Sequence, residues 1–481
     1  MPFWKRLLGS AWPAVTAALG AVALLYFVLF LKLAFADMDG NKCGGGTDCP
    51  RGMGALMLSA LLLGLLAVGS SLLLRKVAPL TRSCLTGVLA AVLALVALWP
   101  GWLGFEWMRG PQMYMSGWQA PDKPSSVKPV GVWAVERWPV MVRARTDGLV
   151  SFNGEGRHGW RLGAPERMSV CALSRTTPSD IGVVAYDRGE GCGARVEAVE
   201  LTSGKRLWGR DTVGAGVAAV GGTAVVADKT LGVIGLDLRG GGELWRAGVP
   251  GECAVRVVDG AGERVLYVEE CGRSARVTAV DSRTGARVWQ TALPVESGLS
   301  EVRVLSAQPL ALRVKESAER GTDGVLLFDG EGRTRGSVPV AGAEEELLLS
   351  SGSPEPLVSG ELLVVPVRDG KKAGVSAYSL TDGHRAWHTG FGRERVLGLG
   401  RARGAGEVAV VTSEHPWTYL TRLDLGGGGR REESTVLREV PLSQRFAFWP
   451  GPPGSYVFVN LGAYDSEQLP PTFEVLPVWG W

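Results

Sequence analysis

The stretch VTAVDSRTGARVW, residues 277–289, is a phrase that the chain repeats. Close copies are VEAVELTSGKRLW (196–208), GVIGLDLRGGGELW (232–245) and VSAYSLTDGHRAW (375–387). Weaker copies are LVSFNGEGRHGW (149–160), VLLFDGEGRTRGSV (325–338) and YLTRLDLGGGGRRE (419–432). Recurrence at such an interval indicates a repeat architecture, in which each copy builds one unit that must stack on the next.

The phrase itself is typical of a β-hairpin. Its first part, residues 277–281, follows the period of two that places alternate side chains on opposite faces of a strand. The side chains of Asp281 and Thr284 can accept hydrogen bonds from nearby amides, and Gly285 permits a positive φ, so a tight turn follows. The second strand ends at Trp289, whose large apolar ring is expected to pack on an adjacent sheet.

The tryptophans that close four of the copies indicate the size of the unit. Trp160, Trp208, Trp245 and Trp289 are separated by 48, 37 and 44 residues. Four short strands with their turns need this length, which is the size of a propeller blade. The rest of the chain has room for about seven or eight blades; a partial eighth blade in the tail is favoured and seven is the alternative. A β-helix or a sandwich competes, but the long repeat argues against both.

The first 110 residues differ from the remainder and predict a membrane anchor. Three apolar stretches occupy residues 11–35, 55–74 and 84–105, and each is long enough to cross the hydrocarbon layer as an α-helix. Because these stretches carry almost no charge, buried helices of a soluble protein are a poor alternative. Residues 111–130 lack periodicity and are interpreted as a linker, so the predicted propeller comprises residues 131–481.

Flanking charge predicts the orientation of the anchor. Basic residues precede the first stretch at positions 5 and 6 and separate the second from the third at positions 75, 76 and 82. The N-terminus is therefore expected in the cytoplasm and the propeller outside, in a multi-pass protein of the cell membrane. The sequence Ala34-Phe35-Ala36 resembles a signal-peptidase site, but the preceding run is long, so an uncleaved span is favoured over cleavage after Ala36.

Six of the seven cysteines form three local pairs: Cys43/Cys49, Cys171/Cys192 and Cys253/Cys271. The last two pairs stand at matching distances before the tryptophans of their copies, which predicts neighbouring strands bridged at the same place in two repeats. Disulfides persist in oxidising compartments, so this prediction agrees with an extracytoplasmic propeller.

The full phrase resembles the repeat of the pyrroloquinoline-quinone (PQQ)-type, or quinoprotein-type, β-propellers, through Ala279, Asp281, Thr284, Gly285 and Trp289. The copies that end at Trp208 and Trp387 match it with other residues at the acidic turn position. This resemblance covers about residues 131–440 and implies an all-β, PQQ-like propeller preceded by three transmembrane α-helices.

The resemblance does not extend to the catalytic parts of the family. Its enzymes bind the quinone with a calcium ion and usually have a vicinal Cys-Cys pair, whereas this sequence contains no Cys-Cys dipeptide and no CxxCH haem motif. The chain is therefore expected to belong to a non-enzymatic branch. No cofactor and no catalytic, cofactor-binding or metal-binding residue is predicted.

Other polar groups are interpreted as ordinary surface. The four histidines are His158, His384, His388 and His415. His384 and His388 could share one face of a strand, but at about 13 Å apart they are too distant to bind one metal ion, so they are expected to be exposed on an outer strand. The SDIG (179–182) and EEE (344–346) runs are expected to be solvated turns. A formal net charge of +3 indicates no nucleic-acid partner. The sequence thus favours a binding or scaffolding module with a protein partner in the envelope or membrane; alternatives are a quinone-dependent or other enzyme that uses the propeller funnel, or a purely structural envelope protein.

Overall fold

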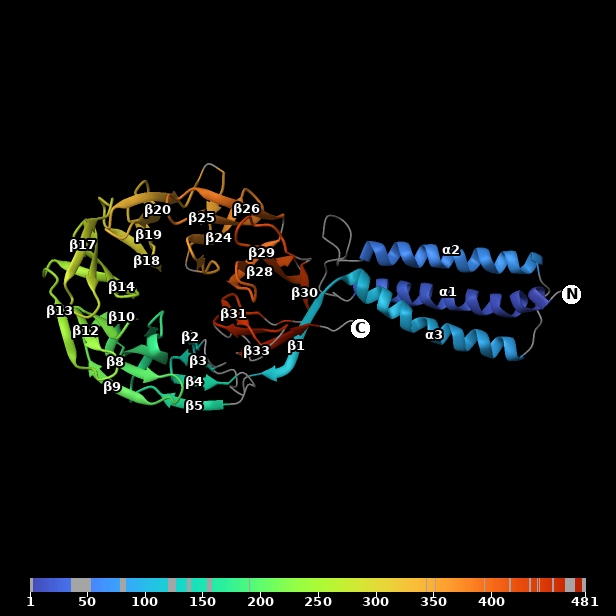
Figure 1. Ribbon diagram of the computed structural model, residues 1–481, viewed down its shortest axis with the longest axis horizontal. Helices are drawn as coiled ribbons and strands as arrows, with labels where there is room; N and C mark the ends of the chain where they lie inside the picture. Colours follow the sequence, from blue (N-terminus) through green and yellow to red (C-terminus); the bar gives the residue numbers. More distant parts are fainter. Residues whose placement is uncertain are drawn as a thin grey trace.

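The computed structural model describes residues 3–35, 53–77, 84–119 and 127–477, except 136–139, 154–157, 190, 343, 351, 393, 415–416, 432–433, 439, 441, 452–453 and 463–471. Three helices come first: α1 (Phe3–Phe35), α2 (Met53–Val77) and α3 (Cys84–Arg109). Short strands joined by turns make up the described remainder (Figure 1). The predicted pair Cys43/Cys49 and His415 lie outside the described residues.

The three helices confirm the prediction of membrane-spanning segments. Within them, Trp12–Lys32, Met53–Leu73 and Gly87–Met108 are long and apolar enough to cross a bilayer. Both α2 and α3 pack on α1, and leucines such as Leu24, Leu65 and Leu95 point outward. Apolar side chains on the outside suit a lipid environment, where a helix satisfies its backbone polar groups internally.

Each blade of the propeller is an antiparallel sheet, and its strands are named in order from the channel outward. Blade 1 is β2 (Pro129–Val135), β3 (Val140–Arg145), β4 (Gly148–Phe152) and β5 (His158–Gly163). Blade 2 is β6 (Ser169–Leu173), β7 (Ile181–Asp187), β8 (Cys192–Glu200) and β9 (Arg206–Asp211). Blade 3 is β10 (Gly214–Val220), β11 (Thr223–Asp228), β12 (Gly232–Asp237) and β13 (Glu243–Ala247). Blade 4 is β14 (Cys253–Ala261), β15 (Arg264–Cys271), β16 (Ser274–Asp281) and β17 (Arg287–Ala292).

The second half of the ring continues the pattern. Blade 5 is β18 (Leu299–Ala307), β19 (Leu310–Glu316), β20 (Asp323–Phe328) and β21 (Thr334–Pro339). In blade 6 two short strands, β22 (Glu346–Leu347) and β23 (Leu357–Ser359), pair with β24 (Leu362–Asp369), followed by β25 (Lys372–Ser379) and β26 (Arg385–Gly392). Blade 7 is β27 (Arg395–Arg401), β28 (Glu407–Glu414), β29 (Trp417–Asp424) and β30 (Thr435–Arg438). Blade 8 is β31 (Phe446–Pro450), β32 (Tyr456–Asn460), β33 (Thr472–Pro477) and β1 (Gln112–Gln119).

These sheets close into a ring, and the three helices extend away from its β1 side (Figure 1). The described residues therefore form eight blades, which confirms the favoured eight over the alternative of seven. Apolar residues on both faces of each blade build separate clusters between neighbouring blades, such as the one that Val225, Val265 and Trp245 share between blades 3 and 4. The core is thus a ring of inter-blade layers.

The segment predicted as a linker contains a strand. Residues Gln112–Gln119 form β1, the outermost strand of blade 8, which pairs antiparallel with β33 and parallel with β30 of blade 7. Blades 7 and 8 therefore share one eight-stranded sheet. The prediction was wrong here because β1 carries no copy of the phrase and both of its partners lie at the opposite end of the chain.

The repeated tryptophan joins each blade to the next. The ring of Trp245 lies on Gly285 of the following blade, where a Cβ would stand 2.7 Å from the indole, and Gly285 has a φ of +69°. Only glycine combines that close approach with that conformation. The indole N–H groups of Trp160, Trp208, Trp245 and Trp387 donate to the carbonyls of Leu201, Leu238, Ser282 and Leu425, at 2.9, 2.9, 2.7 and 2.7 Å. Turn and tryptophan of the phrase are thus two halves of one inter-blade contact.

One of these contacts lacks its hydrogen bond. Trp289 lies against Gly332 of blade 5, but its indole N–H has no hydrogen-bond partner among the described residues. The carbonyl of Gly330, which occupies the acceptor position, instead accepts from the Arg264 guanidinium. Trp289 therefore provides packing without the polar contact.

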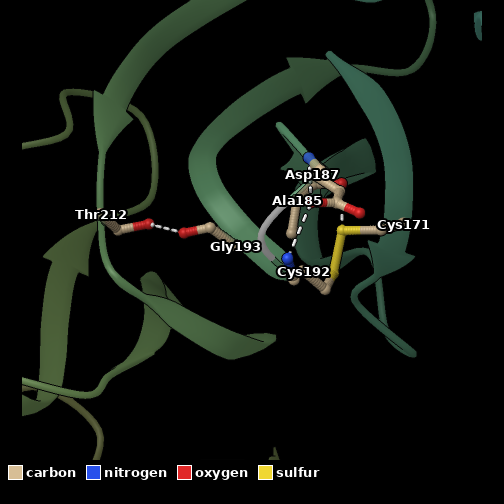
Figure 2. Close-up of a disulfide and its surroundings, with 8 residues drawn as sticks. Cys171, Ala185, Asp187, Cys192, Gly193 and Thr212 are labelled. Atoms are coloured by element: carbon tan, nitrogen blue, oxygen red, sulfur yellow. Dashed lines mark hydrogen bonds between the residues drawn. A yellow bond between two sulfur atoms is a disulfide. The ribbon is translucent and has the colours of Figure 1, made fainter.

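Two disulfides confirm the predicted pairing, although only one joins neighbouring strands. Cys253 and Cys271 occupy paired positions of the adjacent strands β14 and β15. Cys171 of β6 instead reaches Cys192 at the start of β8, with the end of β7 between them, as Figure 2 shows. The Cys171 Sγ atom also lies 3.4 Å from the carbonyl oxygen of Ala185.

Removing the blade 4 disulfide should lower the free energy of unfolding. The bridge spans 18 residues of sequence, and a loop of this size corresponds to about 2–4 kcal/mol. We expect the double variant Cys253→Ser/Cys271→Ser to unfold at a correspondingly lower urea concentration than the wild-type chain. Peptide mapping without reductant provides the direct check, and free thiols at both positions of the native protein would contradict the bridge.

Candidate functional site

The inner strands of the blades surround a central channel that contains a cavity of about 450 Å³. Its walls come from β2 of blade 1, β27 of blade 7 and β31 of blade 8, together with two inserted segments. One segment is 174–180 in blade 2, and the other is 353–357, next to β23 of blade 6. Cavities of this size in a propeller channel are suited to a small molecule or a short stretch of chain.

Arg175 carries a polar connection across the channel. From blade 2, its Nε lies 3.1 Å from Oδ2 of Asp259 on β14, and its Nη1 donates to the carbonyls of Val304 and Leu305 on β18, both at 3.0 Å. The next residue, Thr176, donates to the carbonyl of Ala219 on β10. Segment 174–180 is therefore bonded to blades 3, 4 and 5, and it narrows the channel beside the cavity.

Asp259, the partner of Arg175, is buried in an environment that disfavours its charged form. Burial raises the pKa of the Asp259 carboxyl above its usual range, although the Arg175 charge and the amide of Gly260 act in the opposite direction. The Arg175 side chain is 44% exposed, so solvent screens part of its charge. The ion pair thus holds the inserted segment in place, although the attraction to Arg175 offsets only part of the cost of burying the Asp259 carboxylate.

Replacing Arg175 by Gln should destabilise the chain by about 1–2 kcal/mol at pH 7, because Asp259 would remain buried without its cation. A carboxyl whose folded-state pKa is raised destabilises the folded protein when ionised. This penalty is present above the folded-state pKa and disappears as the pH falls below the unfolded value of about 3.9. Urea unfolding at pH 7 and pH 3.5 measures it. The second substitution Asp259→Asn should restore most of the loss at pH 7, and an equal loss at both pH values would contradict this account.

Strand β31 and the two residues before it add hydrogen-bond donors to the cavity. Gln444, Arg445 and Trp449 all line it, and among the described residues their side chains make no hydrogen bond or ion pair. The one carboxylate in the lining, Glu355, lies 3.4 Å from Nη1 of Arg303. The cavity therefore carries a net positive charge, with donor groups available and its acid already paired.

Aromatic packing holds this wall in position. Phe446 and Phe448 of β31 lie against Gly398 and Gly400 of β27, where added Cβ atoms would stand 2.7 and 2.6 Å from the rings. Phe448 also stacks on Phe458 with a centroid distance of 5.2 Å. Glycine at these two positions lets β27 and β31 approach closely. The hydrogen-bond donors are next to these phenylalanines in the sequence, so the packed aromatic rings fix the position of the backbone that carries them.

The sequence predicted no site residue, and its interpretation of the two polar runs as solvated turns holds only in part. In the SDIG run, Ser179 is exposed in a short 3-10 turn, as predicted, whereas Ile181 and Gly182 are buried at the start of β7. In the EEE run, Glu345 is buried and accepts hydrogen bonds from Tyr378 and Ser376. The length of the β6–β7 connection was the signal that could have identified the inserted segment 174–180.

His388 is exposed on the outer strand β26, as predicted, and it also has partners. Its Nδ1 lies 3.0 Å from both Glu345 and Ser376. Since the carboxylate and the hydroxyl approach the same ring nitrogen, the trio lacks the relay geometry of a catalytic triad, in which they occupy opposite nitrogens. His384 is exposed, as predicted, and its Nδ1 lies 2.6 Å from Asp382.

The residues of the channel do not fit the calcium ion that accompanies the quinone in the enzymes of the PQQ-type propellers. Within the described ranges, no group of three or more His, Cys, Asp or Glu side chains could hold a metal ion. The cavity lining offers the single carboxylate of Glu355, whereas Ca²⁺ takes six to eight oxygen ligands.

Comparison with known families supports the predicted repeat. A family model described as outer membrane protein assembly factor BamB matches residues 192–351, which run from β8 of blade 2 into blade 6. The resemblance to PQQ-like repeats, inferred from the phrase, is thereby confirmed. The chain matches no curated protein.

Solved structures that match the chain share little sequence with it. BamB from Moraxella catarrhalis is 14% identical, with 73% of this chain and 97% of that one covered and a TM-score of 0.41. The computationally designed Ika8 protein is 14% identical, with coverages of 77% and 100% and a TM-score of 0.49. The quinohemoprotein alcohol dehydrogenase ADHIIG from Pseudomonas putida HK5 is 10% identical, with coverages of 74% and 76% and a TM-score of 0.42.

Proposed function

We propose that this protein is a membrane-anchored, extracytoplasmic β-propeller that binds a partner protein at the cell envelope. Residues 1–110 act as the anchor, with the N-terminus in the cytoplasm, and the ring that follows presents its channel and its faces outside. The charge flanking the helices and the two disulfides support this orientation.

The observation that carries the proposal is the direct connection between membrane and ring. Helix α3 ends at Arg109 and β1 begins at Gln112, so only Gly110 and Pro111 separate a membrane helix from the strand that completes blade 8. A connection this short keeps the ring next to the bilayer, where it can meet other membrane proteins. A freely diffusing enzyme would have no use for such an attachment.

The family match supports a partner of the same kind. Its description names an outer membrane protein assembly factor, and a role in assembly implies contact with another protein. Propellers offer broad, rigid faces and a channel, which suit them to binding. The donors on β31 add a chemically distinct part to that surface.

Proximity labelling in living cells tests the proposal. A peroxidase fused to the C-terminus of the full chain should biotinylate envelope or membrane proteins above the level given by the same three helices carrying an unrelated propeller. Protease added to intact cells should also digest the propeller. Equal labelling by both fusions would contradict a binding role, and a propeller that protease reaches only after lysis would contradict the orientation.

A further inference from the structure

The channel cavity combines unpaired donors with apolar walls. The guanidinium of Arg445, the amide of Gln444 and the indole N–H of Trp449 have no partner among the described residues, and all three line the cavity. A guanidinium presents a rigid fork of N–H groups that matches a carboxylate, and an indole N–H can only donate. The polar part of this cavity is thus prepared for an anion with two adjacent oxygens.

The remaining walls are apolar and include Leu397 and Leu399 of β27 and Val132 of β2. These side chains favour an apolar body beside the anion. The carboxylate in the lining, Glu355, already lies beside Arg303, so the other side-chain acceptors are the neutral oxygens of Thr177, Ser353 and Gln444. The several O–H donors of an acidic saccharide would have only these neutral acceptors and backbone carbonyls to bind, whereas a carboxylate on an apolar body needs donors alone.

We propose that the cavity binds the C-terminal carboxylate of an extended, apolar peptide segment, with Arg445 as the principal ligand of the carboxylate. Trp449 offers a donor further along the strand, and the leucines of β27 contact the side chains that precede the terminus. Capture of a chain terminus by clustered donors is an established mode of peptide recognition. This inference rests on the proposed binding function and specifies the chemistry of the partner.

The inserted segment 174–180 supports a terminus as the occupant, in preference to the middle of a chain. Arg175 spans the channel from blade 2 to blades 4 and 5, beside the cavity that it helps to line. A polypeptide threaded through the channel would have to displace this connection. A segment that ends in the cavity leaves it intact.

A pair of matched peptides tests the inference on the full chain in phosphatidylcholine nanodiscs. The probe is a fluorescent tetrapeptide of alanine, valine, alanine and phenylalanine with a free C-terminal carboxylate, and the comparison is its C-terminal amide. Fluorescence anisotropy should show that the amide binds about tenfold to a hundredfold more weakly, the range for a charge-assisted hydrogen bond.

Two substitutions assign the contact. Arg445→Gln should weaken binding of the free acid about tenfold or more and abolish its preference over the amide, whereas Trp449→Phe should weaken it less. Arg283→Gln is the matched control, because Arg283 is exposed in the blade 4 turn and does not line the cavity. Its affinity for the free acid should equal that of the wild-type chain.

Three outcomes would overturn the inference: equal binding of acid and amide, no binding of either, or unchanged binding by Arg445→Gln. The proximity-labelling experiment separates this failure from failure of the proposed function. Partners labelled equally by the wild-type chain and by Arg445→Gln would leave the binding role standing and refute the cavity as its site. Loss of labelling in that variant would support both.

Discussion

Replacing Trp245 by Ala should lower the free energy of unfolding by about 3–5 kcal/mol, the range for a buried aromatic ring. The ring of Trp245 is almost fully buried between blades 3 and 4, and its N–H donates to Ser282 at 2.7 Å. Its removal leaves a cavity above Gly285 and an unpaired carbonyl. Urea unfolding of the full chain in nanodiscs measures the loss, with the midpoint and the slope both recorded.

Phenylalanine substitutions separate the packing from the hydrogen bond. Trp245→Phe removes both part of the ring and the contact with Ser282, whereas Trp289→Phe removes ring alone, because the Trp289 N–H has no partner among the described residues. We expect Trp245→Phe to be the more destabilising by about 1 kcal/mol. Equal losses for the two variants would show that the hydrogen bond contributes nothing to the joint between blades.

The second large loss of stability is expected on substitution in β1, the strand that completes blade 8. Met113 of β1 is 4% exposed and packs in a cluster with Phe473 and Val475 of β33. Met113→Asp would place a carboxylate in this apolar layer without a cation, a change that exceeds about 4 kcal/mol. Blade 8 should then detach from β1, and limited proteolysis should cleave the chain after blade 7 much faster than in the wild-type protein.

The neighbouring residue provides the matched control. Tyr114 lies on the same strand but points to the opposite side and is 45% exposed. The same substitution there, Tyr114→Asp, should change stability by less than about 1 kcal/mol and leave the cleavage rate near that of the wild-type chain. If both aspartates accelerated cleavage equally, a general effect of charge near the membrane would replace our explanation.

Much of this fold follows from local patterns. Three apolar runs of sufficient length predict the three helices, and the turn with its closing tryptophan predicts the blades, because both depend on residues close together in sequence. The contact of Trp245 with Gly285 explains why turn and tryptophan recur together: each copy provides one half of two successive joints. Local patterns do not predict strand β1, because its partners β30 and β33 lie at the far end of the chain.

The candidate site is harder to predict from the sequence, because the residues that form it are also far apart along the chain. Inner strands carry no copy of the phrase, and the cavity unites residues from blades 1, 2, 6, 7 and 8. Arg175 and its acceptor Val304 are 129 positions apart. Only ring closure reveals that these groups face one channel, and that Arg445, an ordinary basic residue in the sequence, stands there without a counter-ion among the described residues.

The place of β1 also determines the order in which the molecule can be completed during translation. This strand leaves the ribosome first, beside its membrane helix, while its partners β30 and β33 emerge last. At about 5–20 residues per second, the delay is on the order of 20 to 70 s. An unpaired edge is prone to join foreign chains throughout that interval. The edge of β1 is covered only after β33 has been translated. Ring closure therefore distinguishes chains that contain β33 from truncated ones.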